Sequence, residues 1–226
     1  MTSPVAVRLV DVRRDFTVGD TVVRAVDGVS FEFQRGAVTA LAGPSGSGKT
    51  TLLSLIGGLL PPSTGAIETD GVDLTRLDQR TLTAFRLRHL GIVFQAFHLI
   101  DALTVVENVE LPLTLAGARR PESRQRAMAL VERFGLAPRA GFLPRSLSGG
   151  EKQRTAIARA LVADPPIVLA DEPTGSLDSS AGEAVVTLLH AEAARHGRAV
   201  IVATHDPRLL RVADTTVRME FGILVD

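Results

Sequence analysis

Cysteine, tryptophan and tyrosine are absent from this 226-residue chain, and lysine occurs only at Lys49 and Lys152. Without cysteine the chain has neither disulfides nor thiolate metal sites. No uninterrupted apolar run exceeds five residues, whereas a membrane-spanning helix needs about 20. The 25 basic side chains are balanced by 25 acidic ones, so a general attraction to nucleic-acid phosphates is not expected. The scarcity of lysine makes Lys49 a residue of interest.

Size and composition favour a single large α/β domain. Of the 226 residues, 45% are hydrophobic, which is enough to bury a substantial core. The first residues, Met1 to Pro4, lack the basic segment and apolar stretch of a secretory signal. We therefore expect the chain to remain in the cytoplasm.

The first part of the sequence is typical of strands and turns. Residues 5–12 and 21–33 are rich in valine and phenylalanine with polar residues between them, and Gly19 marks a turn. We expect an antiparallel sheet there. Residues 37–42 form a short apolar strand that leads into a glycine-rich loop, and residues 49–56 then indicate a buried helix. Further predicted elements are a hairpin at 66–74, a helix at 78–88 and a strand at 91–94.

The sequence changes character between residues 101 and 162. Helical patterns at 103–115, 122–134 and 150–163 follow one another without a strand signal, which indicates a helical insertion. Continuous apolar runs at 167–170 and 199–203, separated by a helix at 180–196, are typical of a buried parallel sheet. A hairpin at 215–225 closes that sheet. We predict one domain over 1–226, with a core at about 1–98 and 163–226 and a helical subdomain at about 99–162.

Residues 43–50 fit the phosphate-binding pattern G-x-x-x-x-G-K-[ST] between a strand and a helix. Glycines allow the backbone N–H groups to turn toward phosphates, and the helix adds its positive end. Lys49 is predicted to reach the terminal phosphates, and Thr50 to ligate Mg²⁺. The alternative is a glycine-rich turn with a surface lysine. The predicted phosphate-contacting residues are Gly43, Pro44, Ser45, Gly46, Ser47, Gly48, Lys49, Thr50 and Thr51.

Two carboxylates follow the apolar strand at 167–170. Asp171 lies at the strand's end, where a Mg²⁺-associated carboxylate is expected in nucleotide-binding folds. Glu172 is then placed to orient or deprotonate a water for attack on a γ-phosphate. Paired acids after a strand also occur in solvated loops, and the upstream glycine loop is what favours the catalytic interpretation.

A second candidate phosphate site begins at Ser148. Ser148 resembles a helix N-cap, and Gly149 and Gly150 leave the N–H groups of the first turn uncovered. Such a helix end binds anions, yet the chain already has one phosphate loop. This pattern indicates a site for a second nucleotide, the alternative being an ordinary glycine-containing helix start.

Over nearly its whole length the chain resembles the nucleotide-binding subunit of an ATP-binding cassette (ABC) transporter. Residues 43–50 match the Walker A loop, 147–151 the signature, and 167–172 the Walker B strand with its glutamate. Residues 176–178, which include Asp178, match the D-loop. The resemblance implies an α/β fold with a P-loop NTPase (RecA-like) core, an N-terminal antiparallel β subdomain and an inserted α-helical signature subdomain.

The resemblance also assigns residues that would otherwise attract no attention. It implies that Gln95 senses Mg²⁺ and the attacking water, and that His205 contacts the γ-phosphate; alone, each is an ordinary residue at a strand end. It further implies a head-to-tail dimer. Ser148, Gly149 and Gly150 of one copy then complete the ATP site around Lys49 of the other.

Three positions depart from the family pattern. Ser176 stands where related chains often carry asparagine and Lys152 where glutamine is frequent, and neither bears on the inferred chemistry. Where a tyrosine usually stacks on adenine, this chain offers Phe16, whose ring can still stack. The alternative for Phe16 is a core residue of the first sheet.

Residues 90–99 and 103–113 are similar to cassettes that serve lipoprotein release, macrolide export and the cell-division permease pair. This likeness implies a separate membrane permease, with the chain held at the cytoplasmic face of the membrane and the segment after Gln95 forming a socket for the permease. A helical lid packed on the core is the alternative for that segment. The competing functions are a regulator of envelope or division machinery without transport, and an ABC ATPase that acts on nucleic acid.

Overall fold

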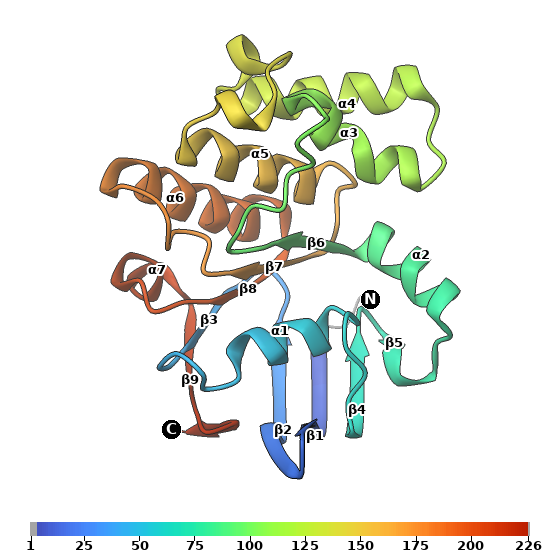
Figure 1. Ribbon diagram of the computed structural model, residues 1–226, viewed down its shortest axis with the longest axis vertical. Helices are drawn as coiled ribbons and strands as arrows, with labels where there is room; N and C mark the ends of the chain where they lie inside the picture. The colour runs from blue at the N-terminus through green and yellow to red at the C-terminus, as the bar shows by residue number, and fades with distance from the viewer. Residues whose placement is uncertain (1–3, 226) are drawn as a thin grey trace.

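A computed structural model describes residues 4–225. The prediction that the chain has no secretory signal used residues 1–4, and most of these lie outside the described residues. The chain folds into two sheets with helices around them (Figure 1). A four-stranded antiparallel sheet has the order β2-β1-β4-β5, and a six-stranded sheet has the order β10-β9-β3-β8-β7-β6. The strands are β1 (Val5–Val18), β2 (Thr21–Gln34), β3 (Val38–Ala42), β4 (Thr64–Thr69), β5 (Val72–Asp73), β6 (Leu90–Val93), β7 (Ile167–Asp171), β8 (Ala199–Ala203), β9 (Thr215–Glu220) and β10 (Ile223–Val225).

The first hairpin is longer than predicted. We expected the first strand to end at Val12, but β1 continues to Val18, which pairs with Thr21 across the turn at Gly19. The pairing contains register shifts between Leu9 and Asp15, which interrupt the alternation of apolar and polar residues. The alternation of apolar and polar residues therefore indicates only the first half of this strand.

Five strands of the larger sheet, β9, β3, β8, β7 and β6, are parallel, and only β10 at one edge runs antiparallel to its neighbour. The strands β3, β6, β7 and β8 are short and nearly all of their residues are buried, as expected for strands covered on both faces. The hairpin of β9 and β10 extends the sheet beside β3. Because β3, β6, β7 and β8 are parallel, the loops that follow them meet at one edge of the sheet.

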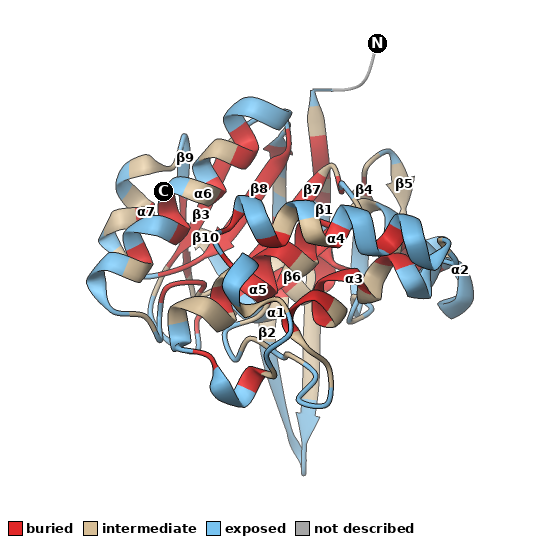
Figure 2. Cartoon of the chain, turned by 90° about the horizontal axis from the view of Figure 1, so that it is seen from above, coloured by how far each residue is buried: buried red, intermediate tan, exposed pale blue. Residues whose placement is uncertain are grey.

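Helices cover both faces of this sheet (Figure 1). Helix α1 lies between the two sheets, and its leucines pack with residues of β1, β2 and β7 in one core. On the opposite face α5 and α6 pack on the strands, α3 and α4 pack on α5, and these helices form a second core. The buried strands occupy the middle of the molecule (Figure 2). The helices are α1 (Lys49–Ile56), α2 (Gln79–His89), α3 (Val105–Leu115), α4 (Arg120–Arg133), α5 (Gly149–Leu161), α6 (Ser179–His196) and α7 (Pro207–Val212).

The helices agree with the sequence signals at their ends. Helix α1 has the predicted bounds. Asp78 caps α2 by accepting a hydrogen bond from the Thr81 amide, and Thr104 caps α3 in a capping box with Glu107. The predicted α/β fold, with an antiparallel β subdomain and inserted helices, is confirmed.

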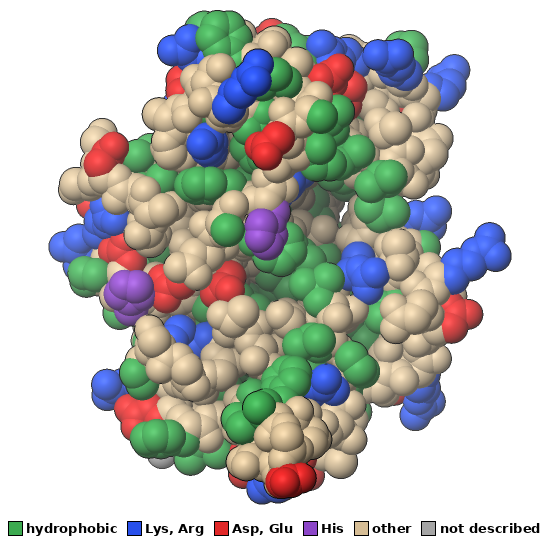
Figure 3. Space-filling view, viewed as in Figure 1, with side chains coloured by type: hydrophobic (Ala, Val, Ile, Leu, Met, Phe, Trp, Pro, Cys, Tyr) green, Lys and Arg blue, Asp and Glu red, His purple; other side chains and the backbone are tan. Residues whose placement is uncertain are grey.

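Within residues 4–225, no helix is both long enough and apolar enough to cross a bilayer. Charged side chains of both signs are spread over the face shown in Figure 3, where basic ones gather over α2 and α4. This mixed surface agrees with the balance of 25 basic and 25 acidic residues.

Candidate functional site

A pocket of about 330 Å³ lies at the edge of the sheet where the central parallel strands end. The loop after β3, the residue two positions beyond β6, the end of β7 and the loop after β8 all reach it, because parallel strands place their carboxyl ends together. The sheet thus gathers residues that are far apart in the sequence. The pocket is lined by Ala25, Ser45, Gly46, Ser47, Gly48, Lys49, Thr50, Thr51, Gln95, Asp171, Glu172 and His205.

At two positions of the glycine-rich loop between β3 and α1, only glycine fits, because neighbouring backbone atoms leave no space for a Cβ atom. A Cβ on Gly43 would lie 2.1 Å from the Met219 carbonyl oxygen, and one on Gly48 would lie 2.2 Å from that of Ala25. Gly48 has φ 105° and caps α1 without any side-chain hydrogen bond. The positive end of α1 therefore faces the pocket through backbone groups alone, which suits an anion.

Lys49 is folded back over this loop. Its side chain is buried at 8% exposure, and Nζ donates to the carbonyl oxygens of Gly43 and Pro44, each at 2.8 Å. The ammonium group thereby spans the loop from the first turn of α1. A single buried cation at the centre of a glycine loop is the charge that a phosphate group requires.

Asp171 and Thr50 form the oxygen-rich side of the pocket. Burial raises the pKa of Asp171, and a hydrogen bond from the Thr50 hydroxyl opposes that rise. Nearby Glu172 raises the pKa of Asp171 further, while Lys49 lowers it. Hard oxygen donors of this kind fit Mg²⁺, which is held by one or two protein groups together with phosphate oxygens and water. In the described part of the chain, no group of three or more His, Asp, Glu or Cys side chains is placed to hold a metal ion by itself, and a Mg²⁺ ion shared with phosphates does not need one.

Glu172 and His205 are in direct contact. The Nδ1 atom of His205 lies 2.8 Å from Oε1 of Glu172. An ionised carboxylate only accepts hydrogen bonds, so Nδ1 carries the hydrogen when Glu172 is charged. The Glu172 side chain is 13% exposed, whereas that of His205 is 75% exposed. A φ of 43° at Glu172 places this residue in the left-handed region, a strained backbone conformation that occurs often at functional sites.

Three residues that the sequence reasoning missed hold the loop around His205. Asp206 accepts a hydrogen bond from the Thr174 hydroxyl at 2.6 Å and binds the Arg208 guanidinium, with Nη2 at 2.6 Å. Arg208 also donates to the Ser179 carbonyl oxygen. The Asp206–Pro207 pair is a recognisable helix N-terminus and was the available signal for Asp206. Its links to Thr174 and Ser179 depend on the tertiary fold.

The dependence of the free energy of unfolding on pH, below about pH 4, tests the ion pair between Asp206 and Arg208. Hydrogen bonding to Arg208 lowers the pKa of Asp206, so its stabilising effect is complete above the unfolded-state pKa of about 3.9 and is lost as the pH falls through the folded value. We expect Asp206→Asn to lower the free energy of unfolding at pH 7 by about 1–3 kcal/mol. The fall in stability below about pH 4 should become shallower. Urea unfolding over a pH series measures both effects.

Asp78→Asn is the matched control for that experiment. Asp78 also caps a helix and also has a lowered pKa, caused mainly by the Thr81 backbone amide. Asparagine caps a helix about as well as aspartate, so the control should change little at pH 7. Equal losses in the two variants would show that the pairing with Arg208 contributes nothing.

Seven of the predicted nucleotide-contacting residues do not line the pocket of this copy. Ser148 caps α5 in a capping box with Glu151, as predicted for a helix N-cap. This helix end does not line the pocket around Lys49. Phe16 is half-buried beneath Arg14, whose guanidinium carbon lies 4.7 Å from the ring centre, and Phe16 is not in either hydrophobic core. The residues outside the pocket lining are Phe16, Gly43, Pro44, Ser148, Gly149, Gly150 and Asp178.

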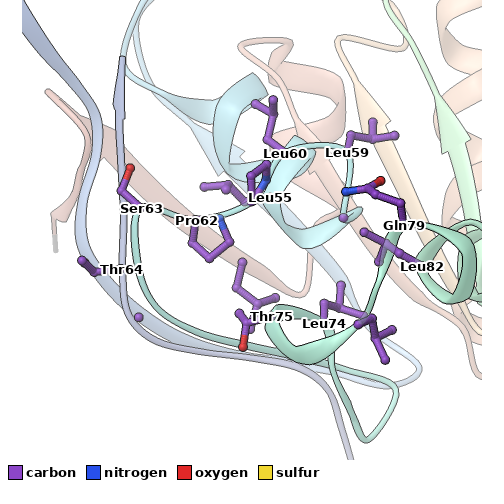
Figure 4. Close-up of a pocket in the computed structure, with 15 residues that line it drawn as sticks. Leu55, Leu59, Leu60, Pro62, Ser63, Thr64, Leu74, Thr75, Gln79 and Leu82 are labelled. Atoms are coloured by element: carbon purple, nitrogen blue, oxygen red, sulfur yellow. The ribbon is translucent and has the colours of Figure 1, made fainter. Parts of the chain in front are cut away.

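A second pocket, of about 230 Å³, lies at the far end of α1 (Figure 4). Leucines from α1, α2 and the segment between them line it, together with Pro61, Pro62 and a few uncharged polar side chains. No residue in its lining is titratable. It therefore offers no acid, base or charged ligand, and the catalytic candidates all belong to the pocket around Lys49.

Comparison with known proteins gives consistent results. The family model for ABC transporters matches residues 26–175. An uncharacterised ABC transporter ATP-binding protein of Mycobacterium tuberculosis is 47% identical over 205 residues, which are 91% of this chain and 62% of that protein. A macrolide export ATP-binding/permease protein of Bradyrhizobium diazoefficiens is 42% identical over 225 residues, which are 100% of this chain and 34% of that protein. The chain thus spans less than two thirds of either relative.

Solved structures resemble the fold closely. An ATP-binding cassette solved as a dimer in a post-hydrolysis state, bound to ADP and Pi, superposes with a TM-score of 0.92 at 38% identity and 97% coverage of both chains. CbiO1 of Clostridium perfringens, part of an ABC transporter complex, gives a TM-score of 0.86 at 28% identity, covering 99% of this chain and 88% of its own.

Proposed function

The chain belongs to the ABC transporter family, and from this premise we propose that it is an ATP-hydrolysing subunit that powers a separate membrane permease. The observation that carries the proposal is the convergence of Lys49, Asp171, Glu172 and His205 on one pocket beside a glycine loop. A phosphate cradle, a buried cation and a carboxylate in contact with a histidine are the parts needed for phosphoryl transfer to water.

Each residue of the pocket has a proposed task. The loop amides and Lys49 bind and orient the phosphates of ATP, with Thr51 beside them. Glu172 orients the attacking water and accepts its proton, and His205, hydrogen-bonded to Glu172, fixes that carboxylate and contacts the γ-phosphate. Thr50, Gln95 and Asp171 are the residues that would hold Mg²⁺, which supplies positive charge against the phosphate oxygens when bound.

Completion of the site requires a second copy. Ser148, Gly149 and Gly150 form an uncovered helix N-terminus away from the pocket, so we propose that they bind the γ-phosphate held by the partner in a head-to-tail dimer. Asp178, which caps α6 by accepting from the Ala181 amide, is proposed to lie at that interface. Phe16 is proposed to stack on the adenine ring, to which its half-buried position in the hairpin gives access.

The permease is proposed to dock beside Gln95. A mostly apolar groove of about 220 Å³ lies between α2, α3, β6 and α5. Its lining includes Leu87, Pro112 and Ala163, together with Arg86 and Arg159. We propose that the helices α3 to α5 form a helical subdomain at about 99–162 that moves relative to the core when ATP joins two copies. Export or mechanical transmission at the cytoplasmic face of the membrane is the proposed use of that motion, as the macrolide export relative suggests.

The concentration dependence of hydrolysis tests this proposal. With Mg²⁺ and saturating ATP, phosphate release by the purified chain should rise with about the square of protein concentration while monomers predominate, because each complete site needs two copies. No release at any concentration, or a rate strictly proportional to concentration from the lowest values, would contradict the two-copy site. Double-stranded DNA or RNA should not stimulate the rate, and stimulation would favour the nucleic-acid alternative.

A further inference from the structure

Arg159, close to the end of α5, has no acidic partner within the described residues. Its guanidinium instead donates to two consecutive backbone carbonyls, from Nη1 to His98 at 2.5 Å and from Nη2 to Phe97 at 2.8 Å. Burial lowers the pKa of Arg159. A charge taken from water without a counter-ion is retained only where backbone dipoles replace the lost hydration.

The two carbonyls belong to a strained loop that begins at Gln95. Phe97 has φ 60° and His98 has φ 47°, so two consecutive residues with side chains adopt the left-handed conformation. Only short local contacts close the loop from within, such as the hydrogen bond from the His98 amide to the Ala96 carbonyl and the packing of the His98 ring on Phe94. Such a loop persists when its surroundings hold it in place. Asn108 binds the backbone of Ile100 at the far end of the segment, and Arg159 supplies the restraint at Phe97 and His98.

Helix α5 connects this restraint to the other proposed phosphate site. Its N-cap is Ser148, and Arg159 lies eleven residues further along, which is roughly 16 Å along a helix axis. The face of α5 between them is buried, with Gln153, Thr155, Ala156, Ile157 and Ala158 in the interior. A packed helix of three turns moves as a rigid unit.

We propose that Arg159 is a positioning residue that ties the Gln95 loop to helix α5. When the Ser148 end of α5 moves onto a nucleotide, Arg159 then moves the loop with it and changes the position of Gln95 in the pocket. The effect of this movement on Gln95 rests on the proposed ATPase function, whereas the attachment of the loop to α5 by Arg159 does not depend on it.

Hydrogen exchange measures the tie without any nucleotide. In Arg159→Met, amides at residues 94–100 should exchange about tenfold faster or more, because two charge-assisted hydrogen bonds are lost. Arg159→Lys keeps a charged donor and should give an intermediate rate. Arg86→Met is the matched control, since Arg86 is also a half-buried arginine that donates to a backbone carbonyl, that of Gly58 at 2.8 Å. It should leave exchange at 94–100 unchanged.

Hydrolysis measures the effect on Gln95. Arg159→Met should lower kcat about tenfold and raise the Mg²⁺ concentration for half-maximal rate, while KM for ATP changes less than about twofold, because Gln95 is displaced and the phosphate loop is not. Arg159→Lys should recover part of kcat. A lower kcat with normal exchange at 94–100 and normal Mg²⁺ dependence would overturn the proposal, as would accelerated exchange in Arg86→Met to the same extent.

The two measurements separate the possible failures. If the wild-type chain does not hydrolyse ATP, the proposed function fails, and the exchange rates still decide whether Arg159 holds the loop. If Arg159→Met does not fold, the comparison of Arg159→Lys with Arg86→Lys replaces it, and equal exchange at 94–100 in those two variants overturns the proposal.

Discussion

Replacing Glu172 with glutamine is expected to reduce steady-state ATP hydrolysis by at least about 100-fold, the usual contribution of a positioned general base. Glutamine keeps the size of the side chain and its hydrogen bond to His205, but it does not accept a proton at neutral pH. Lys49 and the loop amides remain in place, so the affinity for ATP should be nearly unchanged. Phosphate release and binding of a fluorescent ATP analogue measure the two properties separately.

The matched control is Glu183→Gln, which removes the same charge from an exposed position on α6. It should retain the wild-type rate. If Glu172→Gln hydrolyses ATP at a rate close to that of the control, Glu172 is not the base. A loss of ATP affinity equal to the loss of rate would instead indicate a role in binding.

Replacing Gly48 with alanine is expected to destabilise the chain by about 3 kcal/mol or more, because the new Cβ and a backbone oxygen cannot share one place. That Cβ would lie 2.2 Å from the carbonyl oxygen of Ala25 in β2, and Gly48 also has φ 105°. The Met219 Cε atom, 2.8 Å away, is the end of a flexible side chain and can move aside, but the Ala25 oxygen belongs to the backbone of a paired strand and cannot move independently. The loop or β2 must therefore shift, and ATP affinity should fall with it. Urea unfolding without nucleotide gives the stability change directly.

Gly46→Ala provides the control for that prediction. Gly46 has φ 81°, yet a Cβ there meets nothing within 4 Å. Only the conformational strain of a left-handed alanine remains, about 1–2 kcal/mol. Equal destabilisation by the two substitutions would show that the close approach to Ala25 is unimportant.

The phosphate loop could be predicted because its determinants are local. A short apolar strand, three glycines and the start of α1 at Lys49 lie within consecutive residues, and strand, loop and helix follow one another in the structure as predicted. Asp171 and Glu172 were equally accessible, because a strand that ends in acids places them at the carboxyl edge of a parallel sheet. Residues such as Gln95 and His205 carry no local signal, and only the family resemblance singled them out.

The remaining parts of the site depend on contacts between distant segments. Thr174 and Asp206 meet across 32 positions, and Arg159 reaches His98 across 61. No periodicity or spacing indicates which of 23 arginines will be half-buried and bound to backbone carbonyls without an acidic partner in the described part of the chain, since that depends on how α5 packs on β6. The extension of β1 beyond Val12 was missed for a related reason, because register shifts conceal the strand period.

The mass of Glu172→Gln in solution with Mg²⁺ and ATP tests the central claim, that two copies of this chain enclose ATP between Lys49 of one and Ser148 of the other. Light scattering during size exclusion should show the 24.0 kDa chain at about twice its mass with ATP and at its own mass with ADP. Adding Ser148→Arg to the same chain should abolish the doubling, because the arginine side chain fills the space in front of the helix end. A chain that binds ATP and remains a monomer, or a dimer that forms equally well with Ser148→Arg, would contradict the account.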